Sequence, residues 1–208
     1  MNLPFSANIY SEFIDRCCGD IIPAEMRRAQ KEHKTPSPEI APCRLIAFLT
    51  GMLKPRRIID IGCGIGISTL ALHLGFPQAE IYAVDGNRGR VDVCKTFLGE
   101  NPKIQIFNEY AENFLKRVNM DFDLAFVDSV KKEYPNIWEA LEPRLSPHAV
   151  ALFDDVFLYG YIAEPDSNVP PKYKNGAKIL REFVADMSQR HPSFIFPIGG
   201  GMLLVKKS

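Results

Sequence analysis

The sequence predicts an α/β fold built on a doubly wound, mostly parallel β-sheet, and three observations support this. From Arg56 onward, short β-branched and aliphatic runs alternate strictly with helical patterns, which is typical of repeated strand-helix-strand units. A glycine-rich turn follows the first run, at the position where such sheets bind ligands. The last two runs are separated only by three glycines, so they can pair only as an antiparallel hairpin.

The pattern predicts a seven-stranded sheet. The expected strands cover residues 57–62, 80–85, 103–107, 123–128, 149–155, 194–198 and 202–207. Helices are expected to begin near Ser68, Arg88, Ala111, Lys132 and Gly176. The polar, proline-rich segment 163–176 predicts a long loop that could cover a site.

The first 55 residues predict a helical extension. Residues 6–18, 23–33 and 38–53 each place apolar side chains at spacings of three and four, with proline-containing breaks between them. A chain of 208 residues with one such core is expected to form a single domain, residues 1–208, in which the helical segment 1–55 precedes an α/β core over 56–208.

Composition and charge favour a cytoplasmic protein without a membrane partner. Lys plus Arg and Asp plus Glu are 25 each, so no overall field attracts nucleic acid or an anionic surface. No apolar run approaches the roughly 20 residues of a membrane span, and the start lacks the basic-then-apolar pattern of a signal peptide. The five cysteines show no zinc-ligand spacing and indicate free thiols in a reducing compartment.

The glycine loop predicts a ligand held close to the backbone. Gly62, Gly64 and Gly66 permit positive φ angles and close approach, and Ser68 is expected to cap the following helix, whose N-terminus favours a negative group. The spacing is one residue tighter than the G-x-G-x-x-G of dinucleotide sites. Asp85 ends the next strand, where an acid accepts hydrogen bonds from ribose hydroxyls. These features predict an adenosine ligand without choosing the cofactor.

Acidic residues end two further strands. Asp128 ends the fourth strand, and Asp154 and Asp155 end the fifth. These strands are neighbours about 4.8 Å apart in a doubly wound sheet, so the three carboxylates should cluster beside the ligand crevice. Two unit charges about 4 Å apart repel by roughly 4 kcal/mol at an effective dielectric constant near 20. The cluster therefore needs protonation, a nearby Lys or Arg, or a divalent cation, for which hard oxygen ligands favour magnesium, with calcium or manganese as alternatives.

The stretch "IIDIGCGIGIST" followed by "YAVD" resembles the S-adenosylmethionine motifs of Rossmann-like methyltransferases. The resemblance implies a Rossmann-like sheet in which the glycine loop and Ser68 hold the amino-acid end of the cofactor and Asp85 holds the ribose. A gapless comparison of "NEYAENFLKRV" with the family's Gly-Asp-Ala-x-Glu segment puts Glu109 and Tyr110 near the adenine. The full set of cofactor-binding residues that the resemblance implies is Asp60, Gly62, Cys63, Gly64, Gly66, Ser68, Asp85, Gly86, Glu109, Tyr110 and Asp128.

A second set of motifs narrows the resemblance. "DSVKKEY" resembles the D-A-D-K-x-x-Y of cation-dependent O-methyltransferases of the catechol and caffeoyl-CoA type, and "FDDVFLYGYIAEP" and "PIGGGMLLVKK" resemble two further motifs of that family. The resemblance implies Asp128, Asp154 and Asp155 as ligands of a divalent cation, and Lys131 with Asp128 as catalytic residues. Asp155 stands where the family usually has Asn, and Gly200 where it usually has Asp.

The chemistry of methyl transfer suits these residue types. Displacement at a sulfonium methyl group needs an oxyanion held in line, and a cation chelated by two vicinal acceptor oxygens lowers the pKa of one of them. Lys131 could then take the proton, because a neighbouring cation depresses the pKa of a lysine.

The resemblance implies an S-adenosylmethionine-dependent O-methyltransferase that acts on a small catechol-like or phenylpropanoid hydroxylated aromatic acceptor, and it implies a homodimer. Three alternatives stay open. The acceptor could be a hydroxylated uridine in transfer RNA, the chain could bind the cofactor without methyl transfer, or it could be an NAD-linked oxidoreductase, which the tight glycine spacing disfavours. A basic patch for transfer RNA would be made by Arg27, Arg28, Lys31, Lys34, Lys172, Lys174 and Lys178.

Overall fold

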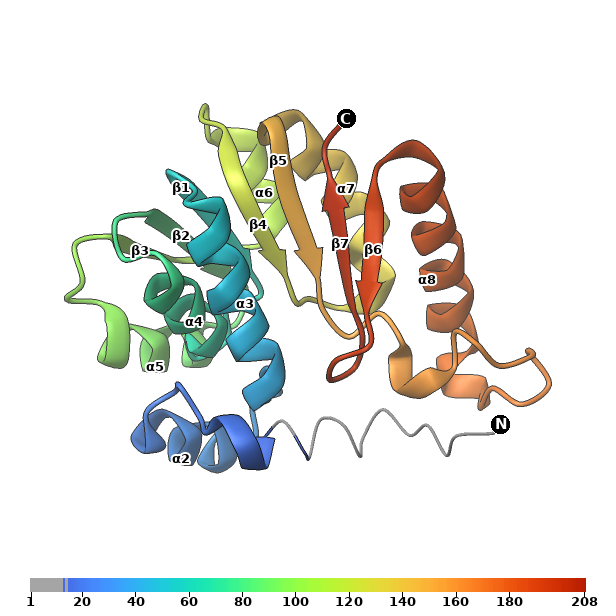
Figure 1. Ribbon diagram of the computed structural model, residues 1–208, viewed down its shortest axis with the longest axis horizontal. Helices are drawn as coiled ribbons and strands as arrows, with labels where there is room; N and C mark the ends of the chain where they lie inside the picture. The colour runs from blue at the N-terminus through green and yellow to red at the C-terminus, as the bar shows by residue number, and fades with distance from the viewer. Residues whose placement is uncertain (1–12, 14) are drawn as a thin grey trace.

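The computed structural model describes residue 13 and residues 15–208 (Figure 1). Two helices, α2 (Ala24–Glu32) and α3 (Ile40–Leu53), precede a core in which strands and helices alternate. They match the second and third helices that the sequence predicts. Most of the first predicted helix, residues 6–18, lies outside the described residues.

The predicted alternation of strands and helices is confirmed. The strands are β1 (Arg57–Ile61), β2 (Glu80–Asp85), β3 (Ile104–Asn108), β4 (Phe122–Val127), β5 (Leu145–Phe153), β6 (Ser193–Phe196) and β7 (Met202–Lys206). The helices of the core are α4 (Ile67–Gly75), α5 (Arg88–Leu98), α6 (Ala111–Arg117), α7 (Tyr134–Leu141) and α8 (Pro171–Arg190). Three 3-10 turns connect them: η1 (Lys131–Glu133), η2 (Glu142–Arg144) and η3 (Leu158–Gly160).

The strand order in the sheet is β3-β2-β1-β4-β5-β7-β6. Strands β1 to β5 pair in parallel with one another, whereas β7 runs antiparallel to both β5 and β6, which confirms the predicted terminal hairpin. The chain order reverses at β1, which pairs with β2 on one side and β4 on the other. Ile61 is in register with Val84 and with Val127, so the residues that follow these three strands meet at one edge of the sheet.

Helices cover both faces of the sheet, as a parallel sheet requires. Ile59 and Ile61 of β1 belong to the apolar cluster that α6, α7 and α8 cover, and Ile58, which points to the other face, belongs to the cluster under α3, α4 and α5. Ile46 of α3 lies in that second cluster, so the N-terminal helical segment packs into the core of the sheet. In Figure 1, α3 lies in front of the sheet and α6 and α7 lie behind it.

Helix α8 begins earlier than the sequence predicts. The expected loop 163–176 ends at Pro170, and residues 171–176 form the first turns of α8 rather than loop. Pro171 occupies the first helical position, where its fixed φ favours a helix start and its missing N–H costs nothing. The prediction of a helix start near Gly176 is therefore wrong by five residues, because a proline in a polar segment favours a loop but is equally suited to the first position of a helix.

The outer face of α3 carries exposed apolar side chains. Phe48 and Met52 are 65% and 66% exposed, and Leu74 of α4 lies exposed as well. In the described part of the chain, no helix combines the length and the apolar character that crossing a bilayer demands. The homodimer that the family resemblance implies would give these side chains a partner surface, and it stays a prediction.

Helices α3 and α4 approach each other at Gly75. A Cβ atom there would overlap the carbonyl oxygen of Ala47 and lie 2.8 Å from Cβ of Thr50. We expect Gly75→Ala to lower the free energy of unfolding by roughly 1–3 kcal/mol, because a backbone oxygen can yield only if the helix shifts. The control is Gly89→Ala in the exposed first turn of α5, where a Cβ would meet nothing closer than 3.4 Å. Equal unfolding free energies of the two variants in urea would contradict this packing.

Candidate functional site

A cavity of about 1180 Å³ opens at the carboxyl ends of the parallel strands. Its wall combines the glycine loop, the residues after β2, β4 and β5, the segment before α3, and η3. Binding cavities for small molecules commonly measure roughly 300–1,000 Å³, so this one can hold a nucleotide-sized ligand together with a second small molecule.

The glycine loop is fixed between two strand ends. The N–H groups of Gly62 and Cys63 donate to the carbonyl of Val84, at 2.8 and 3.2 Å. Gly62 has a φ of +82°, and a Cβ atom there would overlap the carbonyl oxygen of Asp128. Asp128 in turn donates its N–H to the carbonyl of Ile61 at 2.9 Å. Only glycine fits at position 62, and Gly62 and Gly64 form part of the cavity wall.

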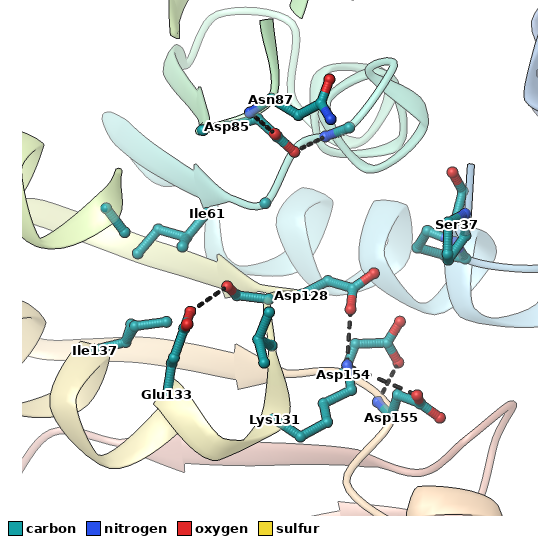
Figure 2. Close-up of a pocket in the computed structure, with 18 of the residues that line it drawn as sticks. Ser37, Ile61, Asp85, Asn87, Asp128, Lys131, Glu133, Ile137, Asp154 and Asp155 are labelled. Carbon is teal, nitrogen blue, oxygen red and sulfur yellow. Dashed lines mark hydrogen bonds and ion pairs between the residues drawn. The ribbon is translucent and has the colours of Figure 1, made fainter. Parts of the chain in front are cut away.

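Asp85 is held at the wall by backbone donors (Figure 2). Its Oδ2 accepts from the N–H of Gly64 at 2.9 Å and its Oδ1 accepts from the N–H of Asn87 at 2.7 Å. Asn108 at the end of β3 donates its side-chain amide to the carbonyl of Asp85. Each carboxylate oxygen keeps a second lone pair, so the fixed carboxylate can still accept from two hydroxyl groups of a ligand.

Asp60 and Ser68 lie behind the glycine loop. The hydroxyls of Ser68 and Thr69 donate to the Asp60 carboxylate, at 2.9 and 2.6 Å. Helix α4 begins at Ile67 with Gly66 as its N-cap residue, so the prediction that Ser68 caps this helix is wrong. Ser68 is already helical, and its hydroxyl donates a hydrogen bond to Asp60 instead. Four of the predicted cofactor residues stand outside the cavity wall, namely Asp60, Cys63, Gly66 and Ser68.

Burial raises the pKa of Asp60 to about 7, although the hydrogen bonds from Thr69 and Ser68 favour the carboxylate. Because the folded protein binds this proton more tightly than the unfolded chain, the stability from protonation is lost as pH rises from about 4 to about 7. We therefore expect Asp60→Asn to destabilise the protein more at pH 5 than at pH 8, measured by urea unfolding. The same loss at both pH values would show that Asp60 does not titrate in this range.

The adenine end of the predicted site brings Gly86 and Tyr110 together. A Cβ atom on Gly86 would come within 2.9 Å of Cε1 of Tyr110, so the ring lies directly against this glycine. Tyr110 is 73% exposed, and both residues form part of the cavity wall. Glu109 also reaches the wall, but its carboxylate binds Arg117, with Nη2 and Oε2 2.8 Å apart.

At the other end of the cavity, the ammonium of Lys131 lies between two carboxylates (Figure 2). Its Nζ is 2.8 Å from Oδ1 of Asp128 and 3.7 Å from Oδ2 of Asp155. Asp154 is buried, and its Oδ1 accepts from the N–H of Asp155 at 2.9 Å. The parallel pairing of β4 with β5 brings these groups together, since Asp154 donates its own N–H to the carbonyl of Val127.

Burial and charge shape the protonation of this cluster. Burial, with the charge of Asp128, raises the pKa of Asp154 to about 7. Burial also raises the pKa of Asp155, while Lys131 opposes that shift. For Lys131, burial lowers the pKa, but the electrostatic effects of Tyr134, Asp128 and Asp155 outweigh it and the net pKa is raised. Lys131 is therefore an ammonium at neutral pH in this arrangement.

The donor chemistry of the cluster suits a hard divalent cation. Three carboxylates face one ammonium, and carboxylate oxygens are the ligands that such ions prefer. Over residue 13 and residues 15–208, however, no three acidic, His or Cys side chains adopt the arrangement of a metal-ligand set. The positive charge between Asp128 and Asp155 is the ammonium of Lys131, so a divalent ion and this ammonium would compete for the same carboxylates.

Tyr134 has a role in the site that the sequence patterns did not predict. The Tyr134 hydroxyl accepts from Nζ of Lys131 at 3.0 Å and donates to the carbonyl of Asp154 at 2.7 Å. The fully buried ring packs at the same time against Phe153 and Phe183. Its position three residues after Lys131, on the same side of a helical turn, was the available signal.

Asp155 and Gly200, the two residues that depart from the family pattern, lie in direct contact. A Cβ atom on Gly200 would overlap Oδ1 of Asp155, whose φ is +57°. The N–H groups of Val156 and Phe157 donate to the carbonyls of Gly201 and Gly200, at 2.9 and 2.8 Å, which fixes this turn against the hairpin loop. Any side chain at position 200 therefore excludes Asp155 from its present place.

A parallel sheet that ends in a reversed hairpin, with a glycine loop facing an acid at the end of β2, defines the class of Rossmann-like methyltransferases. Within this class the chain belongs to the O-methyltransferase family, whose model matches residues 20–208.

Similar proteins support this assignment. The caffeoyl-CoA O-methyltransferase of Stellaria longipes is 29% identical over 163 residues, which cover 73% of this chain and 68% of that protein. The chain spans about two thirds of the length of the curated relatives it matches.

Solved structures show the same fold. The SAH-bound methyltransferase PaMTH1 of Podospora anserina superposes with a TM-score of 0.82 at 23% identity, over 100% of this chain and 99% of that one. The O-methyltransferase TomG of Streptomyces achromogenes, solved in complex with SAM, superposes with a TM-score of 0.78 at 19% identity, over 96% of each chain.

Proposed function

We propose that this protein is an S-adenosylmethionine-dependent O-methyltransferase whose acceptor is a small hydroxylated aromatic compound of the catechol or phenylpropanoid kind. The observation that carries the proposal is one cavity that joins the Gly62 loop and Asp85 at one end to Lys131 and three carboxylates at the other. Membership of the O-methyltransferase family supports the reaction type, and the caffeoyl-CoA relatives support a phenolic acceptor.

Each end of the cavity has a separate task in this proposal. Asp85 accepts hydrogen bonds from the ribose hydroxyls, and Gly62 and Gly64 let the amino-acid end of the cofactor approach the backbone. Tyr110 and Gly86 flank the adenine. Asp128 and Lys131 follow β4, the neighbour of β1, so they form the wall next to which the reactive end of the cofactor would bind.

Lys131 manages the proton in this mechanism. A divalent cation held by Asp128, Asp154 and Asp155 would supply Lewis-acid polarisation of the acceptor hydroxyl. With such a cation as the partner of Asp128 and Asp155, the Lys131 ammonium would release its own proton to solvent, and the resulting neutral amine would then take the proton of the acceptor hydroxyl. Tyr134 keeps Nζ in place through its hydroxyl oxygen. The acceptor oxyanion then forms a bond to the methyl carbon while the carbon–sulfur bond breaks, and the sulfonium leaves as a neutral thioether.

We expect Lys131→Ala to lower kcat about 100-fold or more, since general-base catalysis contributes typically 10²–10⁴-fold. The measurement is methyl transfer from labelled S-adenosylmethionine to catechol with magnesium present. Affinity for S-adenosylhomocysteine, followed by calorimetry, should stay unchanged, because Lys131 lies at the acceptor end. The matched control is Lys132→Ala, an exposed neighbour on the same turn, which should keep full activity.

Three outcomes would contradict separate parts of the proposal: the role of Lys131, the divalent cation and the class of acceptor. Full activity of Lys131→Ala would remove Lys131 from catalysis. Activity that survives a chelator would argue against the divalent cation and leave the ammonium as the cation of the site. Methylation of transfer RNA, with none of catechol or caffeic acid, would overturn the small aromatic acceptor.

A further inference from the structure

We infer that Arg181 is a positioning residue for the acceptor site, and that the tyrosine cluster it fixes recognises the aromatic ring of the acceptor. We define the tyrosine cluster as Tyr159, Tyr161 and Tyr173. The inference rests on the proposed function and extends it to the choice of acceptor.

Arg181 projects from α8 onto the segment that follows η3. Its Nε donates to the carbonyl of Ile162 at 2.8 Å, and its Nη2 donates to the carbonyls of Tyr161 and Glu164 at 2.9 and 2.6 Å. Its Nη1 binds the carboxylate of Asp166 at 2.5 Å. One guanidinium thus links four acceptors within residues 161–166 to α8. The planar guanidinium carries several N–H donors in a fixed arrangement, which allows it to bind several acceptors at once.

The backbone before this segment needs such support. Leu158, Tyr159 and Gly160 have φ angles of +45°, +59° and +88°, three consecutive residues in the left-handed region. Residues other than glycine populate this region rarely, and they persist there only when surrounding contacts determine them. Leu158 is buried in the apolar core under α8, and Arg181 supplies the polar anchors on the far side of the turn.

The anchors of Arg181 also set the geometry of the tyrosine cluster. Tyr161 comes from the anchored segment and Tyr173 from the first turn of α8, and their rings stack with centroids 5.1 Å apart at 28°. The ring of Tyr159 lies 5.5 Å from that of Tyr173 and 6.4 Å from that of Tyr161. Because Arg181 holds the carbonyl of Tyr161 itself, its loss would release this ring from α8.

Two members of the tyrosine cluster line the cavity that contains the reacting end of the proposed site. Tyr159 and Tyr173 belong to the same cavity wall as Lys131 and Asp155. Tyr159 is 74% exposed, whereas Nζ of Lys172 lies 4.6 Å from the ring centroid of Tyr173 and occupies one side of it. Tyr159 therefore offers the most accessible ring of the cluster, and the chemistry it favours is an aromatic ring in stacked or edge-on contact. The acceptor class is an aromatic compound whose ring extends from the reacting hydroxyl toward η3.

The test compares acceptor kinetics across Arg181 and Tyr159 variants, with caffeic acid as the acceptor. Arg181→Ala and Tyr159→Ala should each raise the acceptor KM about 10-fold, the scale expected for one lost aromatic contact, and change kcat little. Arg181→Lys should recover only part of the loss because it lacks the fork, and Tyr159→Phe should keep the wild-type KM. Affinity for S-adenosylhomocysteine should be unchanged throughout.

Arg190→Ala is the matched control. Arg190 lies on the same helix and also binds carboxylates, those of Asp186 and Glu142, but it makes no contact with the tyrosine cluster. A rise of KM in Arg190→Ala equal to that in Arg181→Ala would overturn the positioning role. An unchanged KM in both Arg181→Ala and Tyr159→Ala would overturn the whole inference.

A binding measurement separates failure of this inference from failure of the proposed function. Caffeic acid is titrated into the protein saturated with S-adenosylhomocysteine and magnesium, and no turnover is needed. If the wild-type protein transfers no methyl group, the proposed function is wrong, while a loss of binding in Tyr159→Ala still supports the tyrosine cluster. If the wild-type protein does not bind caffeic acid, the inference is overturned. Thermal unfolding of each variant identifies any variant that fails to fold. If Arg181→Ala does not fold, the inference is tested with Tyr159→Ala.

Discussion

The site depends on one backbone approach, that of Gly62 to the carbonyl of Asp128. No Cβ atom fits between them, so the glycine loop after β1 lies directly on the end of β4. The same strand end carries Lys131 within one turn. The glycine loop and the charged cluster around Lys131 are therefore held next to each other by this backbone contact. The order of the strands, with β1 between β2 and β4, makes this contact possible.

The second constraint is charge. Asp128, Asp154 and Asp155 lie at adjacent strand ends because β4 and β5 are parallel neighbours, and their mutual repulsion must be offset. Lys131 offsets part of it, but the cluster has three carboxylates for one ammonium; burial, with the charge of Asp128, raises the pKa of Asp154 to about 7. The same imbalance makes the carboxylates suitable for a divalent cation and keeps Lys131 charged without one. Position 155 carries Asp where the family usually has Asn, which adds a negative charge to the cluster. Gly200 has no side chain and so leaves the space that Asp155 occupies.

Patterns along the chain were sufficient to predict the fold, whereas contacts across it were not. The period of the apolar residues distinguishes strands from helices. Once the strands are assigned, the sequence shows which acidic residues come at their ends. Asp60 and Ser68 show the limit: both belong to the glycine motif, yet they bind each other behind the loop, since helix α4 starts two residues earlier than a cap at Ser68 requires. The link between Arg181 and the segment 161–166 joins residues about 20 positions apart through backbone carbonyls, which leave no trace in the side-chain pattern.

The central claim is that the cavity binds S-adenosylmethionine between the Gly62 loop and Asp85. The most direct test is calorimetric titration of the wild-type protein and of Asp85→Ala with S-adenosylmethionine and, separately, with NAD. We predict that the wild-type protein binds S-adenosylmethionine and not NAD, and that Asp85→Ala binds it at least about 10-fold more weakly, since charge-assisted hydrogen bonds contribute roughly 1.5–3 kcal/mol. Binding of NAD alone, or equal affinity of Asp85→Ala and the wild-type protein for S-adenosylmethionine, would contradict the account.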